Sequence, residues 1–212
     1  MDGVIFDSEP IHERIFVEYA RSLGFEPVPS EYLHFIGTSS VSQWQFMKER
    51  YGLTGTPQEL SDAKMNLYKI FINSTTGLKP IPGIHELLDD LRAHGVPFAV
   101  ASSNTSDIVE ATLSAIGLAD AFTVRVCGDH VELAKPAPDI FLLAATRLGA
   151  RPEECIVIED STNGVLAAER AGMRCIGFDN PHSPGQDLKR ANIRLGTLEG
   201  LTVKRLLALL DG

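Results

Sequence analysis

The sequence is poor in positive charge, and it contains no long apolar run. Its 212 residues carry 19 Lys and Arg against 28 Asp and Glu, which gives a net charge of -9. Nucleic acids and anionic membranes bind basic surfaces, so this balance predicts neither as a partner. No apolar run approaches the length of a membrane span, and no basic leader precedes an apolar stretch. These absences favour a cytoplasmic protein and leave its oligomeric state open.

Cysteine is also scarce, and the three that occur are not spaced as metal ligands or disulfide partners. Each lies in or beside a short apolar run, where a cysteine behaves as a small hydrophobic side chain. Hydrophobic residues make up 44% of the chain and charged residues 22%, which is ordinary for a globular protein. A chain of this length is sufficient for one full core with a smaller appendage. The cysteines are Cys127, Cys155 and Cys175.

From about residue 81 onward, an amphipathic helix, a glycine and a short apolar strand follow one another repeatedly. The strands are apolar on nearly every residue, a pattern typical of strands that are buried on both faces of a parallel sheet. Alternating helices and strands predict right-handed crossovers, and therefore an α/β fold with a doubly wound, mainly parallel, Rossmann-like core. The expected strands cover residues 97–101, 122–127, 155–158 and 174–178.

Residues 11–78 differ, because they show helical periodicity with no clear strand. This pattern predicts a helical cap inserted near the start of a core that is formed by residues 1–10 and 79–212. Several large apolar side chains of the cap either line a pocket or form the cap interior, and the interior is the favoured reading. These are Phe35, Trp44, Phe46 and Met47.

Polar side chains stand directly after the apolar strands or in the turns between them. In an open α/β sheet, ligands bind at the carboxyl ends of the strands, so these side chains are the candidates for a site. One group follows the strand at residues 97–101, and an acidic pair follows the strand at residues 155–158. The candidates are Asp2, Ser102, Ser103, Asn104, Lys135, Glu159 and Asp160.

These residue types suit the handling of a phosphoryl group. A phosphoryl group spreads negative charge over its oxygens, so its transfer needs positioning and positive charge. Ser102 and the backbone amides after it can donate to phosphate at a helix N-terminus, and Lys135 supplies a compact cation. Glu159 and Asp160 offer the hard oxygen ligands that Mg²⁺ prefers. Each residue also has an ordinary alternative as a helix cap or a solvated side chain.

Four short motifs occur in a fixed order, and together they carry a family resemblance that spans the whole chain, cap included. Counted from Asp2 to Ser102, Lys135 and Asp160, the gaps are 100, 33 and 25 residues. In this order the chain resembles a haloacid dehalogenase superfamily hydrolase, of the subgroup that contains sugar-phosphate phosphatases and β-phosphoglucomutase. The motifs are Met1-Asp-Gly-Val4 with Asp7-Ser8, then Ser102, Lys135-Pro136 and Glu159-Asp160.

The resemblance implies a Mg²⁺-dependent phosphatase that acts on a small phosphorylated metabolite through an aspartyl-phosphate. Asp2 matches the second Asp of the family motif Asp-x-Asp-Gly, which acts as general acid and base. Ser102 and Lys135 would hold the transferring phosphoryl group, with Ser103 and Asn104 beside them. The metal would be held by the first Asp of the motif, by Asp160, by Glu159 directly or indirectly, and by the backbone carbonyl of Asp2.

The chain departs from the family pattern at its first residue. The nucleophilic Asp of the motif would stand one position before Met1, on an apolar strand that is also missing from the sequence. We expect a truncated or misassigned start. The alternative is an inactive variant that binds a phosphorylated ligand without turning it over.

A second alternative is a phosphosugar mutase. His12 and Lys64 match positions retained in β-phosphoglucomutase, but Ser40 stands where that enzyme has an arginine for the second phosphate. A serine cannot supply that charge, so the phosphatase reading is favoured. His12 and Lys64 are therefore candidate substrate contacts. The ordinary alternatives are packing within the cap for His12 and a solvated side chain for Lys64.

Overall fold

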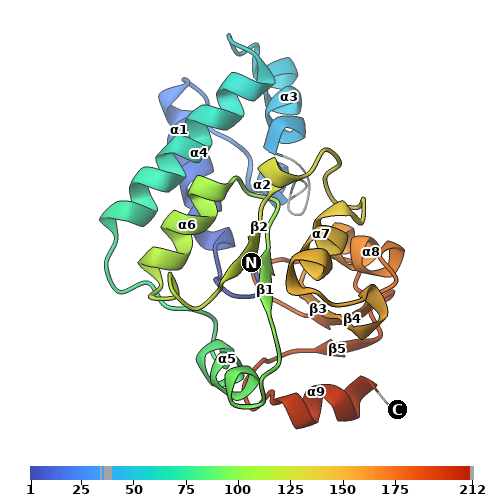
Figure 1. Ribbon diagram of the computed structural model, residues 1–212. Coiled ribbons are helices and arrows are strands. Elements are labelled where there is room, and N and C mark those ends of the chain that lie inside the picture. Colours follow the sequence, from blue (N-terminus) through green and yellow to red (C-terminus); the bar gives the residue numbers. More distant parts are fainter. Residues whose placement is uncertain (34, 36–39, 211–212) are drawn as a thin grey trace.

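The computed structural model describes residues 1–33, 35 and 40–210 (Figure 1). Helices dominate the N-terminal part of the chain, and the later part alternates between helices and short strands. Two single turns of 3-10 helix follow strand and helix ends, at Gly128–His130 and Pro152–Glu154. No described helix is long and apolar enough to cross a membrane.

Every strand runs parallel to its neighbour, as the buried apolar pattern predicts. Within the described residues the strands form two sheets, one with β1 beside β2 and one in the order β3-β4-β5. The α/β class with parallel strands is therefore confirmed, although the sheet is divided rather than continuous. The strands are β1 Ala99–Ala101, β2 Val124–Val126, β3 Ile156–Glu159, β4 Arg174–Phe178 and β5 Ile193–Leu195.

The first residues of the chain connect the two sheets, and Figure 1 shows the N-terminus beside β1 and β2. Asp2 accepts a hydrogen bond from Ser102, which directly follows β1. The α-amino group of Met1 lies close enough to Glu159, at the end of β3, for their charges to interact. The side chains of residues 1 and 4–6 are buried in the main apolar core. The site-bearing ends of both sheets therefore meet at the start of the chain.

Helices follow the strands as the periodicity predicts, and local chemistry fixes their ends. Ser161 caps α8 by accepting a hydrogen bond from the Gly164 amide at 3.0 Å. Helix α7 ends at Gly149, whose φ of 68° lies in the left-handed region that favours glycine. Helix α7 contacts β1 and β2, and α8 contacts β3 and β4. These helices are α5 Ile84–Ala93, α6 Ser106–Ala115, α7 Asp139–Leu148, α8 Thr162–Arg170 and α9 Val203–Leu210.

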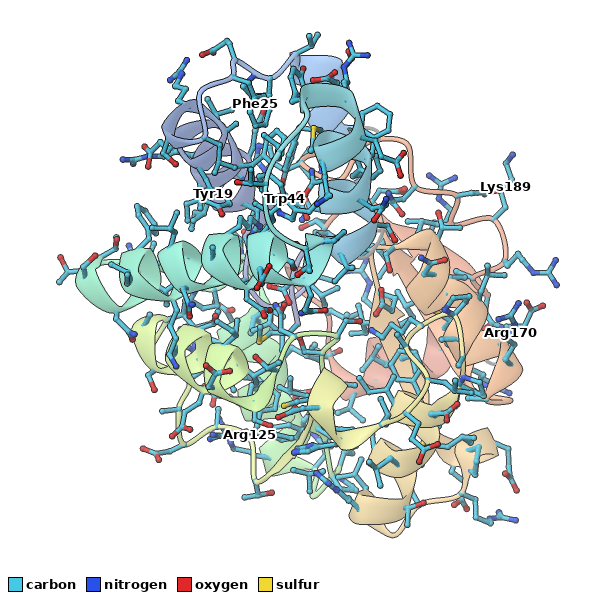
Figure 2. All side chains as sticks on the ribbon, turned by 90° about the horizontal axis from the view of Figure 1, so that it is seen from above. Tyr19, Phe25, Trp44, Arg125, Arg170 and Lys189 are labelled. Carbon is cyan, nitrogen blue, oxygen red and sulfur yellow. The ribbon has the colours of Figure 1, made fainter. Side chains whose placement is uncertain are left out.

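The N-terminal helices enclose an aromatic cluster of their own. Trp44 is fully buried, with Tyr19 at 5.1 Å and Phe16 at 5.6 Å between ring centroids. Figure 2 shows Tyr19, Phe25 and Trp44 together in this part of the molecule, far from Arg125, Arg170 and Lys189. The helices are α1 Glu9–Ser22, α2 Pro29–Leu33, α3 Ser40–Tyr51 and α4 Pro57–Ser74.

Helix α4 joins these helices to the α/β part of the chain. It begins at a capping box, in which Thr56 and Glu59 exchange side-chain and backbone hydrogen bonds. Its Tyr68 is fully buried in the main core, and Lys69 forms an ion pair of 2.6 Å with Asp107 of α6. The cap is therefore anchored to the core along α4, while the domain boundaries at residues 10/11 and 78/79 stay predictions.

The structure adds elements that the sequence pattern did not predict. Strand β5 is three residues long and alternates apolar with charged side chains, so it lacks the continuous apolar run of its neighbours. Helix α9 follows it and packs Leu206 into the main core. Strands β1 and β2 are each three residues long, shorter than the apolar runs that predicted them.

Candidate active site

A cavity of about 750 Å³ lies where the carboxyl ends of β1 and β3 face helices α1, α3 and α4. Its walls come from both parts of the chain, so side chains distant in sequence share one space. Every candidate site residue expected from the sequence lines it. These residues are Asp2, His12, Lys64, Ser102, Ser103, Asn104, Lys135, Glu159 and Asp160.

Asp2 is held in place by donors from two directions. Its Oδ2 accepts from the Ser102 hydroxyl at 3.3 Å and from the Asn104 amide at 3.1 Å. Its Oδ1 accepts from the Ser8 hydroxyl at 2.9 Å. Because Ser102 and Asn104 follow β1 directly, the end of that strand fixes the orientation of the Asp2 carboxylate.

Lys135 and Glu159 form a buried ion pair on the opposite wall. The ammonium group of Lys135 also lies 4.7 Å from the centre of the Phe141 ring. Burial alone would raise the pKa of Glu159, but the Lys135 ammonium and the Met1 amino group outweigh it and lower that pKa. Glu159 also accepts from the Ser161 hydroxyl at 2.9 Å. Glu159 is therefore a charged group that orients Lys135.

Asp160 is buried beside Glu159 and receives one hydrogen bond, from the Ser183 hydroxyl at 2.8 Å. Burial and the charge of Glu159 raise the pKa of Asp160 to about 7. The backbone at Gly3 passes directly against this carboxylate, since an added Cβ would lie 1.9 Å from Asp160 Oδ2. Gly3 also has a φ of 66°, so any larger residue there would be both strained and in collision.

The carboxylates at this end of the cavity fit a hard divalent cation. Asp160 and Asp2 present carboxylate oxygens, and the raised pKa of Asp160 shows a buried negative charge without full compensation. The Gly3 backbone leaves no side chain between Asp160 and residues 2–3, so carboxylate and carbonyl oxygens can share one ion. Glu159 is engaged by Lys135 and Ser161, so its role as a direct ligand stays a prediction.

On the cap side, Lys64 and His12 form a buried pair. Lys64 Nζ lies 2.7 Å from His12 Nδ1, and the His12 ring stacks on Tyr68 with 4.1 Å between centroids. Burial lowers the pKa of Lys64 to about 8, although Glu9 and Asp2 oppose the change. Burial and the Lys64 charge lower the pKa of His12 well below its usual value. The neutral imidazole therefore accepts from the Lys64 ammonium.

Glu9 lines the cavity, although it was not predicted as a site residue from the sequence. It stands two residues after Asp7, and its Oε2 accepts from the Tyr32 hydroxyl at 2.7 Å. Burial raises the pKa of Glu9, and the Tyr32 hydrogen bond partly offsets that change. Glu9 therefore places a carboxyl group on the cap wall, opposite the Lys135 end.

Helices α3 and α4 add polar groups that no described residue satisfies. Gln43 and Ser61 line the cavity and are 6% and 4% exposed, and neither side chain has a hydrogen-bond partner among the described residues. The buried hydroxyl of Ser40 likewise has no partner there. Residues 36–39, which directly precede Ser40, lie outside the described residues. Buried polar groups favour a partner, so these point to a polar ligand in the cavity.

The large apolar residues of the cap were expected either to form the cap interior or to line a pocket, and the structure shows examples of both. Trp44 and Met47 are fully buried in the cap cluster, as the favoured reading expects. Phe35 lines the cavity while packing against that cluster. Phe46 is exposed and lies 5.3 Å from Phe35 between ring centroids.

Contacts from the C-terminal half of the chain also shape the site, and no local sequence signal marked them. Ser183 bonds Asp160, and the Asn180 amide donates to the Gly3 carbonyl at 2.9 Å. His182 Nδ1 lies 2.5 Å from Asp7 Oδ2, at the passage from the first residues into α1. The only available signal was the polar Asn-Pro-His-Ser run after the β4 strand.

Comparison with known families and sequences shows which proteins this chain is similar to. The profile of the haloacid dehalogenase-like hydrolase family matches residues 1–178. The chain is 32% identical over 207 residues to hexitol phosphatase A of Escherichia coli, covering 97% of the chain and 92% of that protein. It is 33% identical over 187 residues to a bifunctional riboflavin kinase/FMN phosphatase of Arabidopsis thaliana, covering 88% of the chain. The match spans 48% of that longer protein.

Solved structures show the same fold across the full chain. CbbY from Rhodobacter sphaeroides, in complex with xylulose-(1,5)bisphosphate, superposes with a TM-score of 0.84 at 26% identity. The superposition covers 97% of this chain and 96% of that one. The fold of this chain therefore recurs among proteins of related sequence.

Proposed function

The chain belongs to the haloacid dehalogenase-like hydrolase family, and we propose that it is a Mg²⁺-dependent phosphatase for a small, hydroxyl-rich phosphate ester. Its relatives include phosphatases, and the reaction class is hydrolysis of a phosphoric monoester. One observation carries the proposal. A single cavity joins phosphate-handling groups with fixed partners, at the strand ends, to polar groups on the cap that include Gln43 and Ser61, neither of which has a hydrogen-bond partner among the described residues.

Lys135, Ser102 and Asn104 are the groups that we propose for binding the phosphoryl oxygens. Lys135 is buried and oriented by Glu159, so its charge acts in a setting that water screens weakly. Ser102 and Asn104 both reach Asp2, so donors and carboxylate converge on one point. A phosphoryl group bound there would contact the positive charge and the acid-base group together.

Asp2 is the residue that we propose for proton transfer to and from the leaving oxygen. Its carboxylate is positioned by Ser8, Ser102 and Asn104, which leaves it little rotational freedom. The family places the nucleophilic Asp two positions before this residue, which is one position before Met1. We therefore expect turnover only from a chain that carries that Asp.

Enzymes of this family use a divalent metal, and Mg²⁺ fits the hard oxygen donors at Asp160 and residues 2–3. When bound, the ion would supply positive charge to the phosphoryl oxygens. Asp160 would hold it with the Asp2 carbonyl, and Ser183 would keep the Asp160 carboxylate oriented. Glu159 would contribute through Lys135.

The substrate class follows from the cap wall. Gln43, Ser61 and Glu9 offer an amide, a hydroxyl and a carboxyl group, which together suit the hydroxyl groups of a polyol or sugar. Named relatives act on hexitol phosphates and on fructose 1-phosphate, which have this chemistry. The wall also offers Lys64 as a cation, and its ammonium group already donates to His12.

A phosphosugar mutase is the second candidate, since one superposed structure is a β-phosphoglucomutase at 25% identity. Ser40 lacks the positive charge that a second phosphate needs, so hydrolysis is the proposed outcome. An inactive phospho-ligand binder is the third, and it would bind phosphate without turnover.

The test uses an extended chain, defined as residues 1–212 preceded by an apolar strand that ends in Phe-Asp. Hexitol phosphate and a hexose bisphosphate are supplied with and without magnesium chloride, and free phosphate and isomerised sugar are both measured. Magnesium-dependent release of phosphate from the hexitol phosphate is the expected result. Isomerised sugar without net phosphate release would establish the mutase, and binding without either product would establish the inactive binder.

A further inference from the structure

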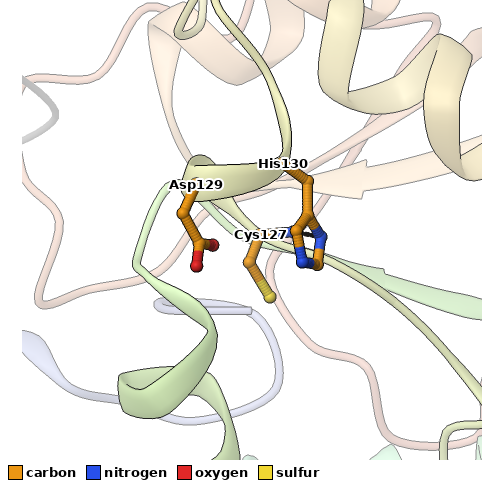
Figure 3. Close-up of side chains that lie close together, drawn as sticks. All are labelled: Cys127, Asp129 and His130. Carbon is orange, nitrogen blue, oxygen red and sulfur yellow. Dashed lines mark hydrogen bonds between the residues drawn. The ribbon is translucent and has the colours of Figure 1, made fainter.

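Three potential metal ligands lie together just after β2, outside the groups discussed so far. Figure 3 shows the Cys127 thiol, the Asp129 carboxylate and the His130 ring close to one another. One ligand atom from each lies within 4.8 Å of the others. These residue types can bind a cation, but the hydrogen bonds that they make give them a different role.

The hydrogen bonds of His130 occupy both of its ring nitrogens. Nδ1 accepts from the Cys127 amide at 3.1 Å and faces the Arg147 guanidinium at 3.3 Å. A nitrogen that accepts from two donors carries no proton, so the proton of the neutral ring is on Nε2, which points at the Ser106 hydroxyl at 3.1 Å. Burial also raises the pKa of the Cys127 thiol. These residues therefore serve as hydrogen-bonding groups.

Asp129 caps helix α6 from a distant part of the chain. Its Oδ1 accepts from the Ser106 amide at 3.1 Å and from the Ser106 hydroxyl at 2.9 Å. Thr105, the residue at the N-cap position of α6, makes no capping hydrogen bond of its own. The first turn of α6 is consequently held by the loop after β2.

The backbones of the two loops are also in direct contact. The Gly128 amide donates to the Asn104 carbonyl at 2.8 Å. An added Cβ at Gly128 would lie 2.2 Å from the Ser103 carbonyl oxygen, so only glycine allows this approach. The segment from Ser102 to Ser106 is therefore joined to residues 128–130 by backbone and side-chain bonds together.

Each of these loops leads to residues that we propose for phosphate binding. Ser102 and Asn104 stand on the first, and the second continues directly into the turn that holds Lys135. We infer that Asp129, supported by His130, is a positioning residue that sets the spacing between Ser102–Asn104 and Lys135. The inference rests on the proposed phosphatase site, and Asp129 itself does not line the cavity.

Removal of the Asp129 carboxylate should loosen that spacing. In Asp129→Ala the Ser106 amide and hydroxyl lose their Asp129 acceptor, and the contact between the Ser106 hydroxyl and His130 Nε2 is left as a side-chain link between the two loops. Misplaced binding groups lose much of their combined effect, so we expect the Kd for inorganic phosphate to rise by about tenfold. Asp129→Asn keeps an oxygen acceptor for Ser106 and should restore the Kd to within about twofold of the starting chain.

Glu132→Ala is the matched control. Glu132 is exposed on the same loop, makes no side-chain hydrogen bond to a described residue, and its truncation removes the same charge. Its Kd should stay within about twofold of the starting chain, because long-range charge at the surface is screened. Ser106→Ala provides an independent variant that deletes the hydroxyl link while leaving the backbone bond to Asp129. It should weaken phosphate binding less than Asp129→Ala does.

The experiment is calorimetric titration of the 212-residue chain and these four variants with inorganic phosphate, in magnesium chloride throughout. Thermal unfolding of each variant is measured without phosphate. Weakening in Asp129→Ala, rescue in Asp129→Asn and an unchanged Glu132→Ala would support the positioning role. Equal affinities for Asp129→Ala and Glu132→Ala, or no rescue by Asn, would overturn it while leaving the phosphate site intact. Absence of phosphate binding by the starting chain itself would overturn the proposed function as well.

Discussion

The two sides of the cavity are built in different ways. On the strand side, Asp2, Lys135, Glu159 and Asp160 each have at least one hydrogen-bond or ion-pair partner. On the cap side, Gln43 and Ser61 are buried with no hydrogen-bond partner among the described residues. A group with fixed partners can be preorganised for one chemical step, whereas a group without them is free to bond whichever ligand enters. We propose from this difference that the strand side performs the chemistry and the cap side selects the substrate.

This division predicts that single changes on the strand side affect every substrate, and that changes on the cap side affect only some. The largest effect should come from Lys135→Met in the extended chain. Loss of the buried cation leaves the phosphoryl charge and Glu159 uncompensated, so kcat/KM should fall by about 10³ for all phosphate esters. Steady-state rates with a hexitol phosphate and an aryl phosphate measure it. Lys204→Met, at an exposed lysine, is the control, and equal rates for the two variants would remove Lys135 from the site.

The next effect concerns the metal. Asp160→Asn removes a charged hard ligand, so the magnesium concentration at half-maximal turnover should rise by at least about tenfold. Ser40→Ala should leave that midpoint nearly unchanged, because Ser40 belongs to the cap side of the cavity and is not a proposed metal ligand. Titration of magnesium chloride against phosphate release by the extended chain distinguishes them. An unchanged midpoint for Asp160→Asn would place Asp160 outside the metal shell.

The cap side should respond selectively. Gln43→Leu removes two hydrogen-bonding groups from the wall while keeping a side chain of similar size, so kcat/KM for the hexitol phosphate should fall by about tenfold. The value for an aryl phosphate, which has no hydroxyl groups to bind, should stay the same. Gln45→Leu changes an exposed residue of the same helix and should affect neither substrate. A parallel loss on both substrates would show that Gln43 supports the fold of the site rather than its selectivity.

The smallest effect is on stability and depends on pH. Burial lowers the pKa of Lys64 to about 8 from its usual 10.5, so the unfolded chain binds this proton more tightly than the folded chain. Folding is therefore penalised below pH 8, and the penalty is relieved as the pH rises from 8 toward 10.5. Lys64→Met should be more stable than the starting chain at pH 7, by about 1–3 kcal/mol. That advantage should shrink by pH 10 in urea unfolding, and a constant difference would contradict a strained, buried lysine.

Much of the strand side could be predicted because its signals are local. Apolar runs predicted β3 and β4 closely, and the polar residues after them identified Glu159 and Asp160. Strand β5 escaped because its three residues contain a charged arginine in the middle, which breaks the apolar run. Helix α9 was missed as well, although its leucines recur at helical spacing.

The residues that position or line the site without carrying a motif were not predicted, for a different reason. Asp129 reaches Ser106 across 23 positions, and Ser183 reaches Asp160 across 23, so neither contact leaves a periodic trace in the sequence. Gln43 reads as one polar residue among others on an amphipathic helix. Only the structure shows that it is buried at the cavity wall, without a hydrogen-bond partner in the part of the chain that the structure describes.

The most direct test of the account is phosphate release from a generic aryl phosphate by two chains. One is the 212-residue chain and the other is the extended chain, each with and without magnesium chloride. The account predicts magnesium-dependent turnover by the extended chain and none by the shorter one, because Asp2 provides the second position of the motif and not the first. Turnover by the shorter chain that Asp2→Asn abolishes would contradict it, since Asp2 would then be the nucleophile.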